Sequence, residues 1–172
     1  MADVSDTLDR LTVLVPDFPA PGIVFRDLSP VLADGAALRE VTDALVAPFA
    51  GRIDAVAGIE ARGFVLAASA AYSLGLGMLV IRKAGKLPGD VLSESYALEY
   101  GEATLEVHPN ALPAGSRVLI LDDVLATGGT LRAATSLVER AGWIVAGIGV
   151  VIELEELGGR EGLGDVHARS IR

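Results

Sequence analysis

The chain has 172 residues, 51% of them hydrophobic and 22% charged, which fits one folded domain spanning residues 1–172 and excludes a disordered chain. A formal net charge of -9 at pH 7 argues against a nucleic-acid-binding protein, although local N–H groups and cations can still hold a small anion. The absence of cysteine excludes disulfides, thiolate metal sites and a cysteine nucleophile, and it fits a cytoplasmic protein.

The first third of the chain is predicted to form two helices separated by a proline-rich arm. Asp6 can cap a short helix that runs to about Leu14. The prolines of residues 16–22 remove backbone donors and restrain the residues before them, so this segment is not helical, and residues 23–25 form a short extended piece. A second helix starts at Asp34. Its buried face is marked by apolar residues at helical spacing, which are Leu38, Val41, Leu45 and Phe49.

The middle of the chain combines strands with a helix. The sequence predicts a buried strand over Ile53–Ile59, a helix over Arg62–Leu74 and a strand over Met78–Arg82. The uncharged stretch from Gly63 to Ile81 approaches the length of a membrane span, but a glycine turn divides it into helix and strand, so we expect no membrane segment. The start of the chain has three aspartates and no apolar run, so we expect no signal peptide.

Residues 83–107 are predicted to form a flexible loop and a hairpin. The part up to Ser93 is polar and rich in glycine. The runs Tyr96–Tyr100 and Ala103–Val107 flank the turn Gly101-Glu102, as the two strands of a hairpin would.

The last third continues the alternation of strands and helices. We predict a strand over Arg117–Leu121, a helix over Leu131–Ala141 and a strand over Trp143–Ile152. This alternation indicates an α/β fold with an open, mostly parallel sheet flanked by helices. His108 and His167 are too few and too far apart to suggest a metal site.

The segment from Val118 to Leu131 carries the clearest chemical signal. A buried strand ends in two acids, a loop of small residues follows, and a helix begins near Thr130. In open α/β sheets, ligands bind beyond the carboxyl ends of the strands, where the start of a helix presents unpaired N–H groups and the positive end of its dipole. In the loop Ala126-Thr127-Gly128-Gly129-Thr130, the glycines let the backbone approach an anion and the threonines add hydroxyl donors. The loop is therefore predicted to hold a phosphate.

The two acids, Asp122 and Asp123, narrow the ligand to a sugar phosphate. Carboxylates accept hydrogen bonds from hydroxyls and repel a bare phosphate, so they suit ribose hydroxyls beside a phosphate in the loop. The segment lacks the P-loop lysine and the glycine pattern of dinucleotide enzymes. A nucleoside triphosphatase and a dinucleotide enzyme are therefore disfavoured.

This segment resembles the phosphoribosyl pyrophosphate (PRPP) loop of type I phosphoribosyltransferases. Further motifs resemble the adenine phosphoribosyltransferase family in that family's order, and they are Phe18–Asp27, Gly58–Phe64, Ile81–Gly89 and Tyr96–Gly101. The resemblance covers roughly Asp17 to Arg160. It implies a type I phosphoribosyltransferase-like fold, with a base-binding hood in residues 1–33 and a mobile hairpin over the site.

The family makes AMP and pyrophosphate from adenine and PRPP, so the resemblance implies an Mg²⁺-dependent pentosyltransferase of purine salvage that forms a homodimer. Mg²⁺ would be bound mainly through pyrophosphate and water, without dedicated protein ligands. Arg62 and the backbone near Ala61 would meet the pyrophosphate, while Arg82, Lys83 and Lys86 would add positive charge there. Because breaking the anomeric bond leaves positive charge on the ribose, we expect an oxocarbenium-like transition state.

The same resemblance places the base against Phe25, with Leu154 at the matching position on its other face. An aromatic ring stacks on any purine, so the choice of adenine requires hydrogen bonds. Backbone groups near Val24, together with Arg26, lie where the family reads the adenine edge.

Glu99 resembles the glutamate of the family's mobile loop and is the candidate for moving a proton on the adenine ring. Tyr100 would help to close the loop and exclude water that would hydrolyse PRPP.

Three alternatives stay open at this point. Enzymes for xanthine or for hypoxanthine and guanine often carry a lysine after the phosphate loop, whereas Leu131–Val138 has only Arg132 as a cation. A non-enzymatic PRPP-sensing regulator would need a nucleic-acid-binding surface that the acidic chain does not suggest. A nucleoside-phosphate hydrolase would need a base to position water, and the sequence offers no obvious one.

Overall fold

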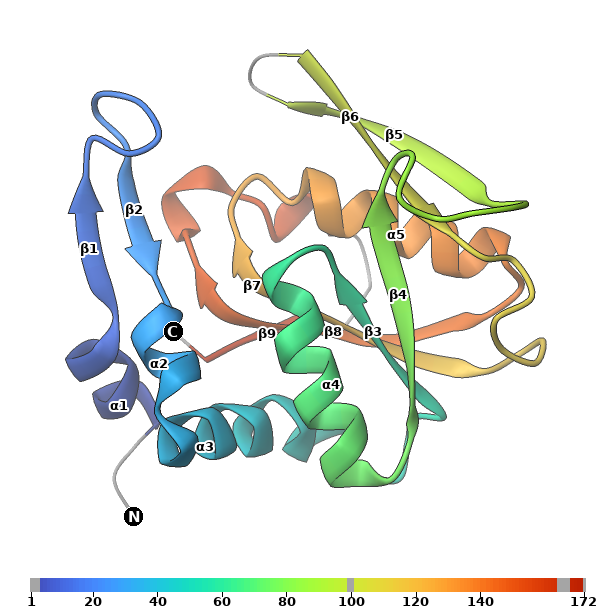
Figure 1. Cartoon of the computed structure of the whole chain (residues 1–172), viewed down its shortest axis with the longest axis horizontal. Helices are drawn as coiled ribbons and strands as arrows, with labels where there is room; N and C mark the ends of the chain where they lie inside the picture. Colours follow the sequence, from blue (N-terminus) through green and yellow to red (C-terminus); the bar gives the residue numbers. More distant parts are fainter. Residues whose placement is uncertain (1–3, 99–100, 164–167, 172) are drawn as a thin grey trace.

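The computed structural model describes residues 4–98, 101–163 and 168–171. Its main feature is a sheet with the strand order β5-β6-β4-β3-β7-β8-β9 (Figure 1). The strands are β3 (Ala55–Ile59), β4 (Gly77–Lys83), β5 (Leu92–Leu98), β6 (Gly101–Val107), β7 (Arg117–Leu125), β8 (Ile144–Glu153) and β9 (Ala168–Ser170). Neighbours from β4 to β9 pair in parallel, and only the β5–β6 hairpin adds antiparallel strands at one edge. The prediction of an open, mostly parallel sheet is confirmed.

Helices cover both faces of this sheet. The first face packs against α1 (Val4–Leu11), α2 (Ser29–Ala33), α3 (Gly35–Val46) and α4 (Arg62–Leu74), and the second packs against α5 (Gly129–Arg140). Short 3-10 turns are η1 (Ala47–Phe49), η2 (Glu155–Leu157) and η3 (Glu161–Leu163).

The central strand β7 supplies both cores because its side chains alternate between the two faces. Leu119 and Leu121 join the core beneath α3 and α4, whereas Val118 and Ile120 join the core beneath α5, and all four are fully buried. Burying each such side chain contributes roughly 1.5–3 kcal/mol, so β7 is held firmly in the middle of the sheet.

Helix α4 lies unusually close to two strands. A side chain on Gly58 of β3 would lie 2.6 Å from the carbonyl oxygen of Gly63, and one on Gly63 would lie 2.7 Å from the carbonyl oxygen of Leu121. Glycine at both positions therefore lets the start of α4 pack directly on β3 and β7.

A small two-stranded sheet forms an arm beside the main sheet (Figure 1). Strands β1 (Val13–Pro16) and β2 (Val24–Asp27) pair antiparallel, with Val15 opposite Phe25. This arm exposes several large apolar side chains, which are Val13, Leu14, Phe18, Ile23 and Val24.

Two local predictions are wrong, one for the first helix and one for the end of the strand that precedes the phosphate loop. Asp6 does not cap the first helix, because α1 begins at Val4 and ends at Leu11, and Leu14 lies in β1, where pairing with β2 replaces helical hydrogen bonds. The strand expected to end at Leu121 continues through both acids to Leu125, because β8 pairs with it that far.

The hairpin also begins earlier than predicted. β5 starts at Leu92, inside the stretch expected to be loop, because Leu92 pairs with Val107. The predicted helix over Arg62–Leu74 is confirmed with the same bounds, followed by a left-handed Gly75 and then β4. No helix in the described ranges is long and apolar enough to cross a membrane.

Candidate active site

The ends of β3, β4 and β7 bring the predicted functional segments together at one edge of the sheet. They surround a cleft with a volume of about 360 Å³. The residues that line it are Glu60, Ala61, Arg62, Lys83, Tyr96, Leu105, Asp122, Asp123 and Thr130. Six of these nine were predicted from the sequence as site residues.

The phosphate loop connects β7 to α5. Residues 124–131 surround a hollow of about 70 Å³, close to the size of a small anion site. Gly128 precedes the first helical residue and has φ of 77°, a conformation that side chains disfavour. No side chain caps this helix start, so its N–H groups face the hollow and can bind a phosphate.

Asp122 and Asp123 are the last polar side chains of β7 before the loop. Asp123 is buried, and its Oδ2 lies 2.6 Å from Nε of Arg62 in an ion pair. Burial raises the pKa of the Asp122 carboxyl well above its usual range, and the neighbouring Asp123 carboxylate raises that pKa further. The two carboxyl groups have lost water on burial, so they can accept hydrogen bonds from the hydroxyls of a ligand in its place.

Arg62 also connects the cleft to the N-terminal arm. Its guanidinium carbon lies 5.0 Å from the ring centroid of Phe25, within the range of a cation–π contact. Phe18 packs edge-on against the same ring, with centroids 5.2 Å apart. Phe25, on β2 between Val24 and Arg26, does not itself line the cleft and is connected to it through Arg62.

Glu60 was missed as a functional residue, although its position directly after β3 parallels that of the acids in β7. Its carboxylate accepts hydrogen bonds from Nε and Nη2 of Arg82, at 3.3 and 3.4 Å, and from the backbone N–H of Lys83 at 3.1 Å. The hydrogen bond from Arg82 is the main reason that the pKa of Glu60 is lowered. Arg82 also donates to the carbonyl of Lys86 at 3.1 Å, so it orders the turn that presents Lys83 and Lys86.

The β5–β6 hairpin lies close to the phosphate loop. The ring of Tyr96 on β5 would lie 3.2 Å from a side chain added at Gly129. Arg140 of α5 donates to the Ser93 carbonyl at 2.8 Å and contacts the Glu94 carboxylate at 2.5 Å, so both ends of α5 contact β5. Glu99 and Tyr100 lie outside the described residues.

Leu154 and Arg132 both lie beside the phosphate loop. The Leu154 amide donates to the Leu125 carbonyl at 2.8 Å, which places Leu154 beside the end of β7. Arg132 donates from Nη1 to the carbonyl of Thr127 at 3.0 Å. Its guanidinium is thus engaged by the phosphate loop.

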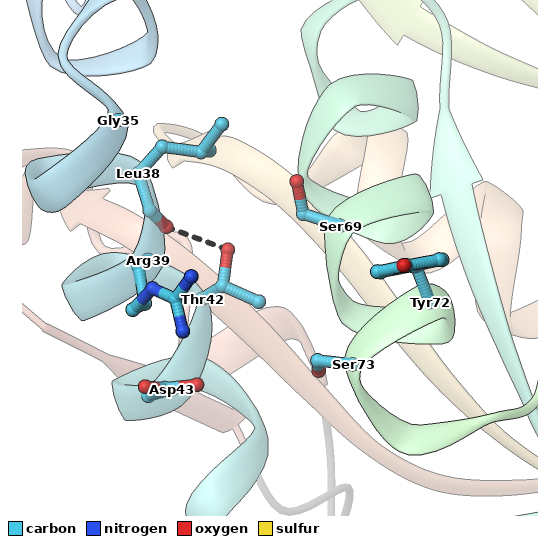
Figure 2. A pocket seen from close by; sticks show the side chains of 8 residues that line it. All are labelled: Gly35, Leu38, Arg39, Thr42, Asp43, Ser69, Tyr72 and Ser73. Atoms are coloured by element: carbon cyan, nitrogen blue, oxygen red, sulfur yellow. Dashed lines mark hydrogen bonds between the residues drawn. The ribbon is translucent and has the colours of Figure 1, made fainter.

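A second concavity lies away from these residues. It is a groove of about 490 Å³ between α3 and α4, and Figure 2 shows Arg39 and Asp43 on one side with Tyr72 on the other. None of the predicted site residues lines it. Six of the predicted site residues line the cleft at the carboxyl edge of the sheet instead.

Comparison with known proteins agrees with this geometry. Residues 31–166 match the phosphoribosyl transferase domain family. An adenine phosphoribosyltransferase of Clavibacter michiganensis is 67% identical over 97% of this chain and 95% of its own length, and one of Thermobifida fusca is 56% identical over 98% and 97%.

Solved structures give the same result. The adenine phosphoribosyltransferase of Saccharomyces cerevisiae, complexed with an imino-altritol bisphosphate and adenine, superposes with a TM-score of 0.94 at 36% identity over all of both chains. That of Giardia lamblia, complexed with 9-deazaadenine, has a TM-score of 0.91 at 43% identity and covers 99% of this chain and 97% of its own. The chain therefore belongs to the phosphoribosyltransferase family and, within it, to the adenine phosphoribosyltransferases.

Proposed function

We propose that this protein transfers the 5-phosphoribosyl group of PRPP to adenine and releases AMP and pyrophosphate, in a reaction of purine salvage that requires Mg²⁺. The observation that carries the proposal is a cleft with an acid pair and the cations Arg62 and Lys83, which meets the hollow of the phosphate loop at Thr130. Those parts match the phosphate, hydroxyl and pyrophosphate groups of one substrate.

The substrate is oriented by these three parts. The 5-phosphate lies on residues 126–130, where helix α5 begins, and the ribose hydroxyls lie on Asp122 and Asp123. The pyrophosphate meets Arg62, the backbone of Ala61, and Lys83. Arg62 is paired with Asp123 in the described structure, so binding of pyrophosphate exchanges one anionic partner of Arg62 for another.

The reaction breaks the anomeric C–O bond and forms a bond from that carbon to a ring nitrogen of adenine. Positive charge grows on the ribose ring, where the acid pair stabilises it, while negative charge grows on pyrophosphate, where Arg62 and Lys83 stabilise it. When bound, Mg²⁺ neutralises part of the pyrophosphate charge.

The residues present are compatible with a metal held by the substrate. Among the described residues, no three His, Asp or Glu side chains gather as a metal-binding set. A site with phosphates, water and nearby carboxylates suits Mg²⁺, which usually keeps several waters and binds through substrate phosphates. The acid pair can orient those waters without a dedicated protein cage.

Adenine stacks on Phe25, with Leu154 on its other side. The backbone near Val24 and the Arg26 side chain read its edge, where a C=O accepts from the exocyclic amine. An oxopurine presents the opposite pattern and leaves buried groups unpaired. The contact of Arg132 with the phosphate loop further supports adenine, because this cation is directed at the Thr127 carbonyl rather than at a base oxygen.

The hairpin closes the cleft. Tyr96 already lies against the phosphate loop and lines the cleft, which supports this role of the hairpin. Glu99 then moves a proton on the adenine ring, and Tyr100 excludes water. We also propose a homodimer, on the resemblance to the family alone. We propose the cytoplasm as its location, because PRPP is a polyanion that cannot cross a bilayer and must be used where it is made.

The test is an assay of nucleotide and pyrophosphate formation with Mg²⁺, PRPP and one purine at a time. We expect AMP from adenine, little product from hypoxanthine, guanine or xanthine, and no product after the metal is chelated. PRPP binding without product from any base would refute the enzyme and favour a sensor of PRPP. AMP breakdown in the absence of pyrophosphate would favour a hydrolase.

A further inference from the structure

Arg132 joins three segments around the phosphate loop. It is exposed on the first turns of α5, and its Nη1 donates to the carbonyl of Thr127 at 3.0 Å. The same nitrogen lies 2.9 Å from the position that a side chain on Gly128 would occupy. The guanidinium also packs against Gly162 of η3, where Nη1 would be the atom nearest to an added side chain and Cζ would lie 3.0 Å from it.

Gly162 belongs to a segment that is itself anchored in the core. Leu163 is buried in the hydrophobic cluster beneath α5, and Arg160 forms an ion pair with the carboxylate of Glu153 at the end of β8. The wall that supports the Arg132 guanidinium is therefore built from packed residues. A glycine at position 162 leaves just enough room for the guanidinium to reach Thr127.

The contact with Thr127 controls the direction of the next amide. In a trans peptide the C=O of one residue and the N–H of the next lie in one plane and point in opposite directions. When Arg132 holds the Thr127 carbonyl on the outside of the loop, the N–H of Gly128 must point to the inside. In the described part of the chain this N–H has no protein acceptor, so it is available to a ligand.

Glycine makes this control necessary. Gly128 and Gly129 can adopt many backbone conformations, so the peptide between Thr127 and Gly128 would otherwise rotate freely before a ligand binds. Because Arg132 fixes this peptide before the ligand arrives, binding does not have to supply the conformational entropy of ordering it. A preorganised loop gains affinity in this way.

We infer that Arg132 is a positioning residue for the 5-phosphate site, which it preorganises by holding the Thr127 carbonyl outward from a support on Gly162. The inference rests on the proposed function, since it concerns the phosphate of PRPP. It predicts an effect on the binding of the phosphate-bearing substrate and none on the base.

Two variants separate position from charge. Arg132→Ala removes the guanidinium, whereas Gly162→Ala keeps it but places a methyl group where it now lies. The φ of Gly162 is not in the left-handed region, so its backbone accepts alanine. Arg39→Ala on α3 is the control, because it removes one positive charge from an exposed residue outside the cleft.

The primary measurement is the Kd of PRPP with Mg²⁺ by calorimetry, alongside kcat and the KM of each substrate. We expect Arg132→Ala and Gly162→Ala to raise the Kd and KM of PRPP by about threefold to tenfold, the effect of one partly exposed charge-assisted hydrogen bond. The KM of adenine, kcat and the melting temperature stay near the wild-type values, and Arg39→Ala matches the wild type throughout.

The inference is overturned if Gly162→Ala binds PRPP like the wild type, because charge alone would then explain any effect of Arg132→Ala. It is equally overturned if both variants behave like the wild type, or if they change kcat or the KM of adenine instead. A wild-type protein that binds no PRPP would refute the proposed function and this inference together. A wild-type enzyme with unaffected variants would refute only the inference.

Discussion

Replacing Gly63 by alanine tests whether the close contact between α4 and β7 holds the acid pair in place. The added Cβ would lie 2.7 Å from the carbonyl oxygen of Leu121 and 3.0 Å from Oδ1 of Asp122. The Leu121 carbonyl belongs to the central strand and cannot rotate away. The start of α4 must therefore move outward, and the Asp122 carboxyl must shift where the remaining contact with the added Cβ stays too close.

The size of the effect follows from two opposing terms. Overpacking of this kind costs roughly 1–3 kcal/mol, while alanine recovers up to about 1 kcal/mol of helix propensity. The net loss is roughly 1–2 kcal/mol. For a domain of this length each kcal/mol lowers the melting temperature by about 2–4 °C, so we expect a decrease of about 2–8 °C.

Thermal unfolding followed by calorimetry measures this decrease, and the KM of PRPP reports the movement of Asp122. Gly35→Ala is the matched control, because Gly35 also lies in the first turn of a helix and no atom is within 4 Å of its added Cβ. That variant should melt at or above the wild-type temperature. If Gly63→Ala is as stable as Gly35→Ala, the contact between helix and strand does not constrain the site.

Three other substitutions test the site. Folding raises the pKa of Asp122, so the stability this group contributes while protonated is lost as the pH rises above its usual pKa of about 3.9. Asp122→Asn should therefore have a higher melting temperature than the wild type near neutral pH, and this difference should narrow toward pH 4. A difference in melting temperature that stays constant across this range would contradict the raised pKa of Asp122. Phe25→Ala should raise the KM of adenine by about tenfold through lost stacking and leave that of PRPP nearly unchanged, and an equal rise in both would argue against a base site there. Glu99→Gln should lower kcat by roughly a hundredfold with intact PRPP binding, and a wild-type kcat would remove Glu99 from the mechanism.

The parts of the fold that could be predicted are those determined by local pattern. Helix α4 was predicted with its observed bounds because a run of alanine and leucine ends at a glycine that adopts φ of 66°. The order of strand, small-residue loop and helix at residues 118–131 was predicted because these three parts are contiguous in the chain. Helix α3 was recognised from its spacing, and Asp34 caps it through hydrogen bonds to the amides of Ala36 and Ala37.

The parts that were missed depend on partners distant in sequence. Strand β1 is defined by its pairing with β2, and the extension of β7 through Asp122 and Asp123 is defined by β8. Glu60 gains its role from Arg82, twenty-two positions away, and no local pattern indicates that ion pair. The support of Arg132 by Gly162 likewise arises only when η3 folds back onto α5.

The arm that bears Phe25 forms a sheet of its own, and within the described ranges no ladder of hydrogen bonds joins it to the sheet that bears the phosphate loop. In the proposed function, recognition of the base and handling of the sugar phosphate are therefore encoded by separable pieces of backbone. Changes in β1 and β2 can alter which base is accepted without disturbing the register of β3, β7 and β8. Such an arrangement lets base preference diverge among related enzymes while the common phosphoribosyl chemistry is retained, and it makes the arm a natural unit for transplantation between them.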